Sequence, residues 1–268
     1  MNINKEGIIL GNGPSLKEID IRSLSNYETI GMNAAYRYWE KINWFPTYYI
    51  CCDIALYETH HEKINSFIKS NKFKKIILLD NFLKYNENIE NISNIYIIKT
   101  SEILQKYKYI TTGSMCVHFY NDILNYKNIY IAGIDCNYVD IIKEADLITR
   151  VKGDITRKLQ ITEKVDYNPN YFFDDYQQPK DIYHIPNKDL HIKSWKIMNE
   201  MDLNIKNICL KSKLTIFEKK KLEDIKYLNV DCEIHKNYIG KKTFSCLIII
   251  NDNSFDLFKI FKKLNDMQ

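Results

Sequence analysis

The residues best suited to chemistry gather near residue 180, where polar and aromatic side chains are densest. Two histidines stand there, His184 and His191, close to Tyr171 and Tyr183. A histidine titrates near neutral pH, so either imidazole could take a proton from an attacking hydroxyl. A loop with several aromatic rings can fold over a ligand and exclude water. His191 is expected in the first turn of a helix and His184 in the loop before it; both stay open as the base, with a slight preference for His191.

The second signal is a glycine-bearing turn, Gly11-Asn12-Gly13-Pro14-Ser15, directly after the apolar run Ile8-Ile9-Leu10. Glycines let a backbone turn sharply and approach a ligand, and free N–H groups at the start of a helix suit a phosphate. Ser15 adds a hydroxyl at the same corner. The turn is neither a Gly-x-Gly-x-x-Gly fingerprint nor a P-loop, and a plain strand-to-helix turn is the alternative.

Polar residues also follow several other strands of the expected sheet. In open α/β sheets, ligands bind outside the carboxyl ends of the strands, so such residues point into one crevice. A second glycine corner, at the start of a helix, offers another place for an anion. Local turns and helix caps are the alternative for each residue alone. The residues at these ends are Asn33, Asp53, Thr111, Thr112, Gly113, Gly133 and Asp135.

Metal ligation finds little support in the sequence. His60 and His61 are adjacent, so on a helix their side chains point about 100° apart and do not converge on one ion. The pair Asp174-Asp175 lies in a late loop rather than after a central strand. We therefore expect no metal site, and we expect His118 to be packed rather than reactive.

The elements that must position these residues alternate between β-branched runs and amphipathic stretches. This pattern predicts an α/β fold with a mostly parallel sheet and helices on both faces. Residues 140–189 hold three of the five prolines and predict an irregular lid. The tail predicts a strand over residues 243–250 and a helix over residues 254–264. The other expected strands are 7–10, 29–32, 48–52, 75–79, 95–99, 128–132 and 207–209, and the other expected helices are 15–24, 55–69, 113–124 and 190–201.

Length and composition exclude several classes of protein. At 268 residues, with 45% hydrophobic and 27% charged residues, the chain is globular rather than disordered. Its net charge of +4 comes without a clustered basic stripe, so we expect no nucleic-acid partner. Seven cysteines without a Cys-x-x-Cys pair indicate buried thiols in a reducing cytoplasm. No signal segment and no apolar run of roughly 20 residues is present, so we expect a cytoplasmic protein that could associate peripherally with the inner face of the membrane.

Several short blocks, taken in order, resemble the bacterial sialyltransferases of glycosyltransferase family 42. The blocks are residues 11–20, which begin Gly-Asn-Gly-Pro-Ser, then Asn33, Ile110-Thr111-Thr112-Gly113, and residues 130–135, Tyr-Ile-Ala-Gly-Ile-Asp. More distantly, the chain is similar to MptE-like and motility-accessory-factor proteins, which share the same nucleotide-binding core. The resemblance covers residues 7–217 and is most specific in the first block.

The resemblance implies a Rossmann-like, GT-A-like domain over residues 1–217, with a lid at about residues 140–189 and an extension over residues 218–268 that could open a further domain. It implies inverting transfer of a sialic-acid-type sugar, either a nonulosonic acid or Kdo, from a CMP donor to a glycan acceptor, as in lipooligosaccharide or capsule synthesis. No metal or other cofactor is implied. CMP would lie along Gly11, Asn12, Gly13, Asn33, Thr112, Gly113 and Asp135.

The family uses a histidine as base and two tyrosines that hydrogen-bond the departing phosphate. The resemblance carries the base to His191 or His184, one tyrosine to Tyr138, and the other to Tyr171 or Tyr183. At one strand end where the family has an asparagine, this chain has Asp53. A carboxylate there would repel a phosphate.

Two other functions stay open. An MptE-like diphosphokinase acting on a pterin would need Mg²⁺ at the phosphates, for which Asp53 and Asp135 are candidates. A nucleotide-binding module without catalysis, acting as an assembly partner, is the third interpretation, because the tyrosine pattern departs from that of the family. A homo-oligomer is a further expectation.

Overall fold

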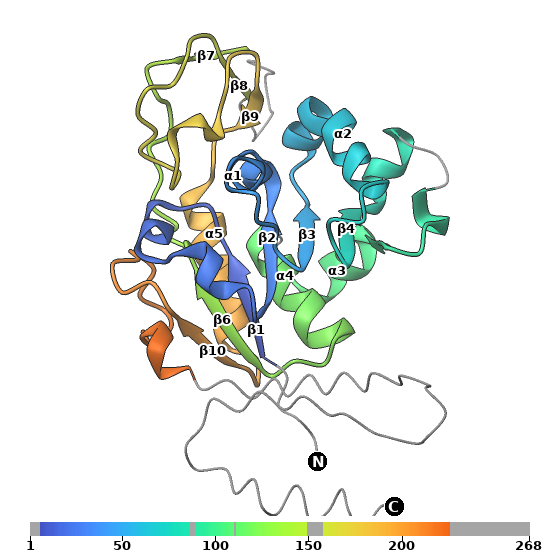
Figure 1. Cartoon of the computed structure of the whole chain (residues 1–268), viewed down its shortest axis with the longest axis vertical. Helices are drawn as coiled ribbons and strands as arrows, with labels where there is room; N and C mark the ends of the chain where they lie inside the picture. The colour runs from blue at the N-terminus through green and yellow to red at the C-terminus, as the bar shows by residue number, and fades with distance from the viewer. Residues whose placement is uncertain (1–5, 86–88, 110, 149–157, 226–268) are drawn as a thin grey trace, which may run out of the picture. The chain divides into compact units, whose positions relative to one another are not determined.

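The computed structural model describes residues 6–85, 89–109, 111–148 and 158–225 of the chain. Residues 4–224 form one compact unit, built on a seven-stranded sheet with a separate three-stranded sheet (Figure 1). The strand and helix predicted at 243–250 and 254–264 lie outside the described residues. The domain boundary at residue 217 stays a prediction.

The large sheet is parallel throughout, with the strand order β10-β6-β1-β2-β3-β4-β5. After β5 the chain returns to the other side of β1, so the direction of strand succession reverses between β1 and β6. Loops leave such a switch point in opposite directions and open a crevice at the carboxyl ends of the strands. The strands are β1 (Glu6–Leu10), β2 (Glu28–Met32), β3 (Tyr48–Cys51), β4 (Lys75–Leu79), β5 (Ile95–Ile98), β6 (Asn128–Ala132) and β10 (Asn204–Asn207).

Six of the seven strands predicted for this sheet are confirmed, and the last is displaced. The prediction placed it at residues 207–209, whereas β10 ends at Asn207. The side chain of Asn207 accepts a hydrogen bond from the N–H of Cys209 at 3.0 Å, which turns the backbone out of the strand. A local side-chain bond of this kind competes with the ladder of the sheet.

Two adjacent tyrosines of β3 show that helices cover both faces of the sheet. Successive side chains of a strand point to opposite faces. Tyr48 packs on Phe119, with ring centroids 5.2 Å apart, at the end of α4 (Thr112–His118). Tyr49 packs on Trp39 of α1 (Tyr36–Ile42) at 6.3 Å and on Phe67 of α2 (Ile54–Ile68) at 6.0 Å. The predicted two-sided α/β arrangement is therefore confirmed.

The predicted helices are confirmed in three of four places. Those near residues 55–69, 113–124 and 190–201 correspond to α2, to α4 with its continuation as the π-helix Phe119–Ile123, and to α5 (Lys188–Asn199). Two short helices were not predicted, α1 and α3 (Thr100–Lys106). Within the described ranges, no helix is long and apolar enough to cross a membrane.

The continuous helix predicted over residues 15–24 is wrong. The chain forms two short 3₁₀ helices instead, Pro14–Glu18 and Ile21–Leu24. Asp20 lies between them in an extended conformation, and its carboxylate accepts a hydrogen bond from the N–H of Arg22 at 3.1 Å. An aspartate at this position caps a new helix rather than continuing the old one.

The prediction that residues 140–189 lack regular structure is also wrong in part. This insertion contains an antiparallel sheet of β7 (Ala145–Leu147), β8 (Lys158–Ile161) and β9 (Ile182–His184). Its buried side chains form a small core of their own, which Tyr183 joins from the edge. The prolines that suggested an irregular chain fall outside the three strands. The core residues are Ile142, Ala145, Leu159, Ile161 and Val165.

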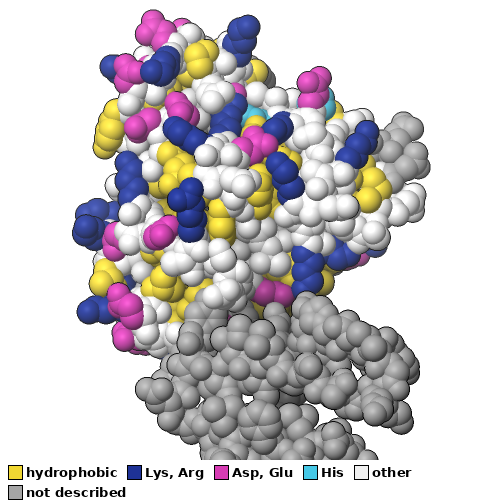
Figure 2. Space-filling model, viewed as in Figure 1, with side chains coloured by type: hydrophobic (Ala, Val, Ile, Leu, Met, Phe, Trp, Pro, Cys, Tyr) yellow, Lys and Arg dark blue, Asp and Glu magenta, His cyan; other side chains and the backbone are white. Residues whose placement is uncertain are grey.

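Charges are mixed on the one face of the described residues that Figure 2 shows. On the face shown in Figure 2, Lys and Arg side chains alternate with Asp and Glu side chains rather than forming a stripe of one sign. A single-sign stripe is the usual mark of a nucleic-acid site. The face in view shows no such stripe among the described residues.

Candidate functional site

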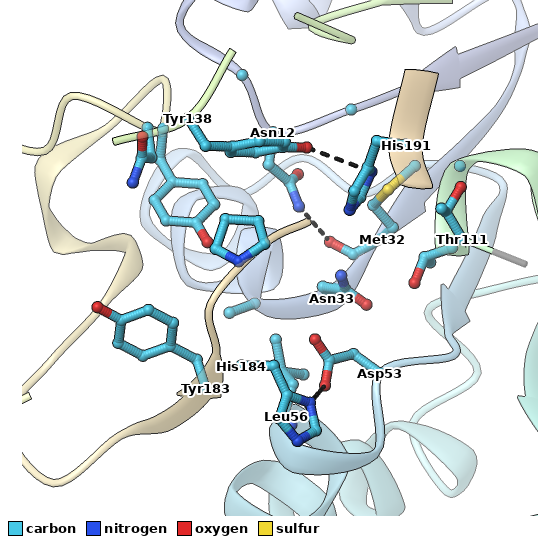
Figure 3. Close-up of a pocket in the computed structure, with 18 of the residues that line it drawn as sticks. Asn12, Met32, Asn33, Asp53, Leu56, Thr111, Tyr138, Tyr183, His184 and His191 are labelled. Atoms are coloured by element: carbon cyan, nitrogen blue, oxygen red, sulfur yellow. Dashed lines mark hydrogen bonds and ion pairs between the residues drawn. The ribbon is translucent and has the colours of Figure 1, made fainter. Parts of the chain in front are cut away.

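A cavity of about 380 Å³ lies at the carboxyl ends of the strands around the switch point. The loops that follow β1, β2, β3 and β6 form one wall, and the insertion with the start of α5 forms the other (Figure 3). Every predicted site residue except Ser15 lines it. These residues are Gly11, Asn12, Gly13, Asn33, Asp53, Thr111, Thr112, Gly113, Gly133, Asp135, Tyr138, Tyr171, Tyr183, His184 and His191.

The glycine turn after β1 is shaped by the loop after β6. The N–H of Gly11 donates to the carbonyl of Ala132 and the N–H of Gly13 to that of Gly133, each at 2.7 Å. A Cβ on Gly13 would stand 2.4 Å from Asp135 Oδ2, and Gly133 itself has a φ of 66°. Glycine therefore lets two backbones pack directly against each other here.

Ser15 departs from its predicted place because Asp135 holds it. The N–H of Ser15 donates to Asp135 Oδ2 at 2.9 Å, and Asp135 Oδ1 accepts from the N–H of Lys213 at 3.4 Å. One of the N–H groups at this helix start thus already has a carboxylate partner within the protein. Asp135 is only 7% exposed and ties together three segments of the chain.

Two asparagine side chains leave acceptors without partners on the cavity wall. Asn12 Nδ2 donates to the hydroxyl of Tyr176 at 2.9 Å and to the carbonyl of Met32 at 3.3 Å. Asn12 Oδ1 and Asn33 Oδ1 are buried with no hydrogen-bond partner among the described residues. Asn33 also has a left-handed backbone, with a φ of 57°. Buried acceptors are normally satisfied, so these two oxygens are suited to the donors of a bound ligand.

The second glycine corner has a structural task as well as a place on the wall. Thr111 and Ser114 form a capping box at the start of α4: the N–H of Ser114 donates to Thr111 Oγ1 at 3.3 Å and the N–H of Thr111 to Ser114 Oγ at 3.0 Å. Helix capping was the alternative interpretation of this corner, and it applies to Thr111. A Cβ on Gly113 would lie 2.8 Å from the ring of Trp195, which also lines the cavity.

His191 and Tyr138 contact each other in the cavity. The hydroxyl of Tyr138 lies 3.5 Å from His191 Nδ1, and the two rings are 5.2 Å apart between centroids. Burial lowers the pKa of His191 to about 4, against the opposing charge of Asp53, so its imidazole is neutral at pH 7. Burial raises the pKa of Tyr138, so its hydroxyl keeps its proton and can donate it in a hydrogen bond. His191 occupies the first turn of α5, as predicted.

His184 and Asp53 form a second pair, joined in Figure 3 by a dashed line. His184 Nδ1 lies 3.7 Å from Asp53 Oδ1. His184 ends strand β9, which corrects the prediction that it lies in a loop. Asp53 precedes α2 and caps it, because its Oδ1 accepts from the N–H of Leu56 at 3.1 Å.

A buried network that was not predicted lies beneath the insertion. Arg37 on α1 binds Asp181 through two hydrogen bonds of 2.5 and 3.0 Å, and donates to the carbonyl of Tyr176 at 2.8 Å. His60 Nε2 lies 3.7 Å from Asp181 Oδ1, while His60 Nδ1 lies 2.6 Å from the hydroxyl of Tyr36. His60, Tyr176 and Asp181 all line the cavity. The one available signal was Arg37 itself, since arginine is rare in this lysine-rich chain.

The charged residues of the cavity bear on whether it could hold a metal ion and on what kind of ligand it could bind. Among the described residues, no group of three or more His, Cys, Asp or Glu side chains could hold a metal ion. Both oxygens of Asp135 already bind backbone amides, so the Mg²⁺ site considered for Asp53 and Asp135 gains no support. The described lining contains three aspartates and neither lysine nor arginine, and apart from these carboxylates it offers a ligand neutral donors and acceptors.

No protein-family model matches the sequence, and no curated protein matches it. Among solved structures, the chain is similar to the MAf glycosyltransferase from Magnetospirillum magneticum AMB-1, with 12% identity and a TM-score of 0.45 over 83% of this chain. The match covers 34% of that protein, so this chain spans about a third of its length. The strand order and the two-sided helix cover establish a Rossmann-like α/β fold for this chain.

Proposed function

We propose that the protein is a glycosyltransferase that moves a sialic-acid-type sugar from CMP to a hydroxyl group of a glycan. The observation that carries the proposal is the convergence of two imidazoles and the Tyr138 hydroxyl on one cavity at the switch point of the sheet. Such crevices bind nucleotides in α/β folds. The sequence resemblance to family 42 supplies the class of donor.

The strand-end loops would hold the nucleotide. The unpartnered oxygens of Asn12 and Asn33 can accept hydrogen bonds from the amino group of cytosine or from ribose hydroxyls. The protonated hydroxyl of Tyr138 can donate to the phosphate as it leaves. When CMP departs from the anomeric carbon, negative charge grows on the phosphate, so donors already aimed at it accelerate the reaction.

One of the two histidines would act as the base. The attacking hydroxyl gives its proton to His191 or His184 while its oxygen forms a bond to the anomeric carbon on the face opposite CMP. The insertion would shield the donor from water, because Tyr171 stacks on Tyr176 with centroids 3.6 Å apart and closes that side of the cavity.

The decisive experiment is mass spectrometry of the products formed from a panel of CMP-sugars and glycan acceptors. His191→Asn and His184→Asn are tested separately, with His61→Asn as the control because His61 does not line the cavity. We expect one cavity variant to abolish transfer while CMP still raises the melting temperature. Full activity in both would remove histidine base catalysis.

Metal dependence separates this function from the diphosphokinase. We expect transfer to continue in EDTA, and CMP to stabilise the protein without Mg²⁺. Stabilisation by ATP with Mg²⁺, together with no product from any CMP-sugar, would replace the transferase by the kinase. Binding of CMP without turnover of any donor would favour the non-catalytic module.

A further inference from the structure

The pairing of Asp53 with His184 brings together two elements that are fixed independently. Asp53 caps α2 at the end of the β3 loop, and His184 ends strand β9 of the insertion. Thr59 Oγ1 of α2 donates to the carbonyl of Ile182 at 3.4 Å, which holds the helix against the strand. The imidazole and the carboxylate therefore face each other across a supported junction (Figure 3).

Asp53 differs from the other two carboxylates of the cavity. Asp135 is satisfied by backbone amides, and Asp181 by the guanidinium of Arg37. Asp53 has one backbone N–H, at Leu56, and the imidazole of His184. Lys158 lies opposite His184 in the strand register, but its ammonium pairs with Glu58 at 3.2 Å. Its charge is therefore offset by a partner other than Asp53.

We propose that Asp53 is a positioning residue for His184, and that His184 is the base that receives the acceptor's proton. This inference rests on the transferase function proposed above. In the step, the acceptor O–H bond breaks and its proton goes to His184 Nε2. The acceptor oxygen bonds to the anomeric carbon, and the bond from that carbon to the phosphate oxygen breaks with its electron pair leaving on CMP.

The carboxylate would act in two ways. It accepts from Nδ1–H, which presents the lone pair of Nε2 to the acceptor, and it stabilises the imidazolium that forms. The separation of 3.7 Å is long for a hydrogen bond, and such contacts shorten when substrate binds. The pairing also explains an aspartate where the resemblance expects an asparagine, because the imidazolium that forms as the acceptor loses its proton offsets the repulsion between Asp53 and the departing phosphate.

His191 is less suited to the same task. Its pKa of about 4 leaves it neutral but weakly basic, and a base works best when its pKa lies near the working pH. Its contact with the Tyr138 hydroxyl instead suits it to orient the tyrosine toward the phosphate. The two histidines would thus serve the acceptor and the leaving group separately.

The first test is the kinetics of Asp53→Asn. Asparagine caps helices as well as aspartate does, so the variant keeps the fold and removes the charge. We expect kcat to fall about 10²-fold without any weakening of CMP binding. Asp53→Ala should lose activity and regain part of it when formate is added, because formate replaces the missing carboxylate. Asp20→Ala is the control for the loss of a helix cap, since Asp20 caps the 3₁₀ helix Ile21–Leu24. A kcat within twofold of wild type in Asp53→Asn would overturn the inference.

The second test needs no sugar transfer. Diethyl pyrocarbonate modifies the free imidazole nitrogen, and mass spectrometry measures the rate at each histidine. We expect Asp53→Asn to slow modification of His184 several-fold and to leave His61 on α2 unchanged. Equal rates at His184 would refute the pair whatever the donor proves to be. A slowed rate with no transfer from any CMP-sugar would refute the transferase and keep the pair.

Discussion

The two walls of the cavity are held in different ways. The wall made by the sheet is fixed by backbone hydrogen bonds between neighbouring loops, such as that from Gly13 N–H to the carbonyl of Gly133. The wall made by the insertion is fixed by side chains, above all by the bond between Arg37 and Asp181, 144 residues apart in the chain. The first wall presents backbone and small polar groups, and the second adds His184, Tyr171 and Tyr183 to the cavity. The wall of the proposed nucleotide site and the wall that carries the proposed base are thus fixed mainly by different interactions, and Asn12 joins the two through its bond to Tyr176.

Arg37→Met tests the side-chain wall and has the largest expected effect. Arg37 and Asp181 are 16% and 11% exposed, so the variant leaves a carboxylate buried without its partner. We expect the free energy of unfolding to fall by about 3–5 kcal/mol, measured by urea denaturation. The double variant Arg37→Met with Asp181→Asn should recover most of the loss. A single variant as stable as wild type would show that the pair does not hold the insertion.

Acidification tests the same wall through His60. Burial lowers the pKa of His60 to about 4 from 6.5, so the unfolded chain takes up a proton that the folded chain excludes. The free energy of unfolding keeps its full value above pH 6.5. It falls by about 3 kcal/mol as the pH is lowered toward 4, because only the unfolded chain binds the proton. We expect His60→Asn to lose correspondingly less stability between pH 7 and pH 4 in urea titrations. An unchanged pH dependence in that variant would contradict the assignment.

Gly13→Ala tests the backbone wall. The added Cβ would stand 2.4 Å from Asp135 Oδ2 and 2.8 Å from the carbonyl of Gly133, neither of which can move freely. We expect a loss of about 1–3 kcal/mol by thermal denaturation and weaker CMP binding. For the loss of stability alone, Gly113→Ala is the comparison variant, because its Cβ would meet the edge of a side chain, Trp195, rather than backbone. Equal costs for both variants would argue against a special role of the turn.

Lys41→Ala has the smallest expected effect and sharpens the comparison. Lys41 also joins α1 to the insertion, through Asp175 at 3.6 Å, but the two side chains are 70% and 53% exposed. Exposed ion pairs contribute little, so we expect less than about 0.5 kcal/mol in the same urea titration. A loss near that of Arg37→Met would mean that burial does not distinguish the two contacts.

The sheet could be predicted from the sequence because its strands are short apolar runs bounded by turn residues. The strand-end rule then placed Asn33, Asp53 and Asp135 around one crevice, and the structure brings them to one cavity. Local side-chain bonds caused the errors near this wall. Asp20 divided an expected helix, and Asn207 ended a strand early.

The insertion could not be predicted in the same way. Its strands have three or four residues, too few for alternation to show, and their core forms only when distant segments meet. His60 was missed because it was judged with its neighbour as a metal ligand. Tyr176 was missed because tyrosine is so frequent in this chain that its place carried no signal. A contact between side chains that are far apart in the sequence does not require a periodic pattern of hydrophobic residues in either segment, so such a pattern could not predict it.

The packing of Trp195 against Gly113 also gives the protein an optical signal. The indole lines the cavity, whereas Trp39 is buried against the sheet at Gly31 and Trp44 donates to Ser25. Indole fluorescence responds to the polarity and mobility of its surroundings, so filling the cavity should alter the emission of one of the three tryptophans and spare the other two. Occupancy of this site is thus readable by fluorescence from the protein itself, without a label.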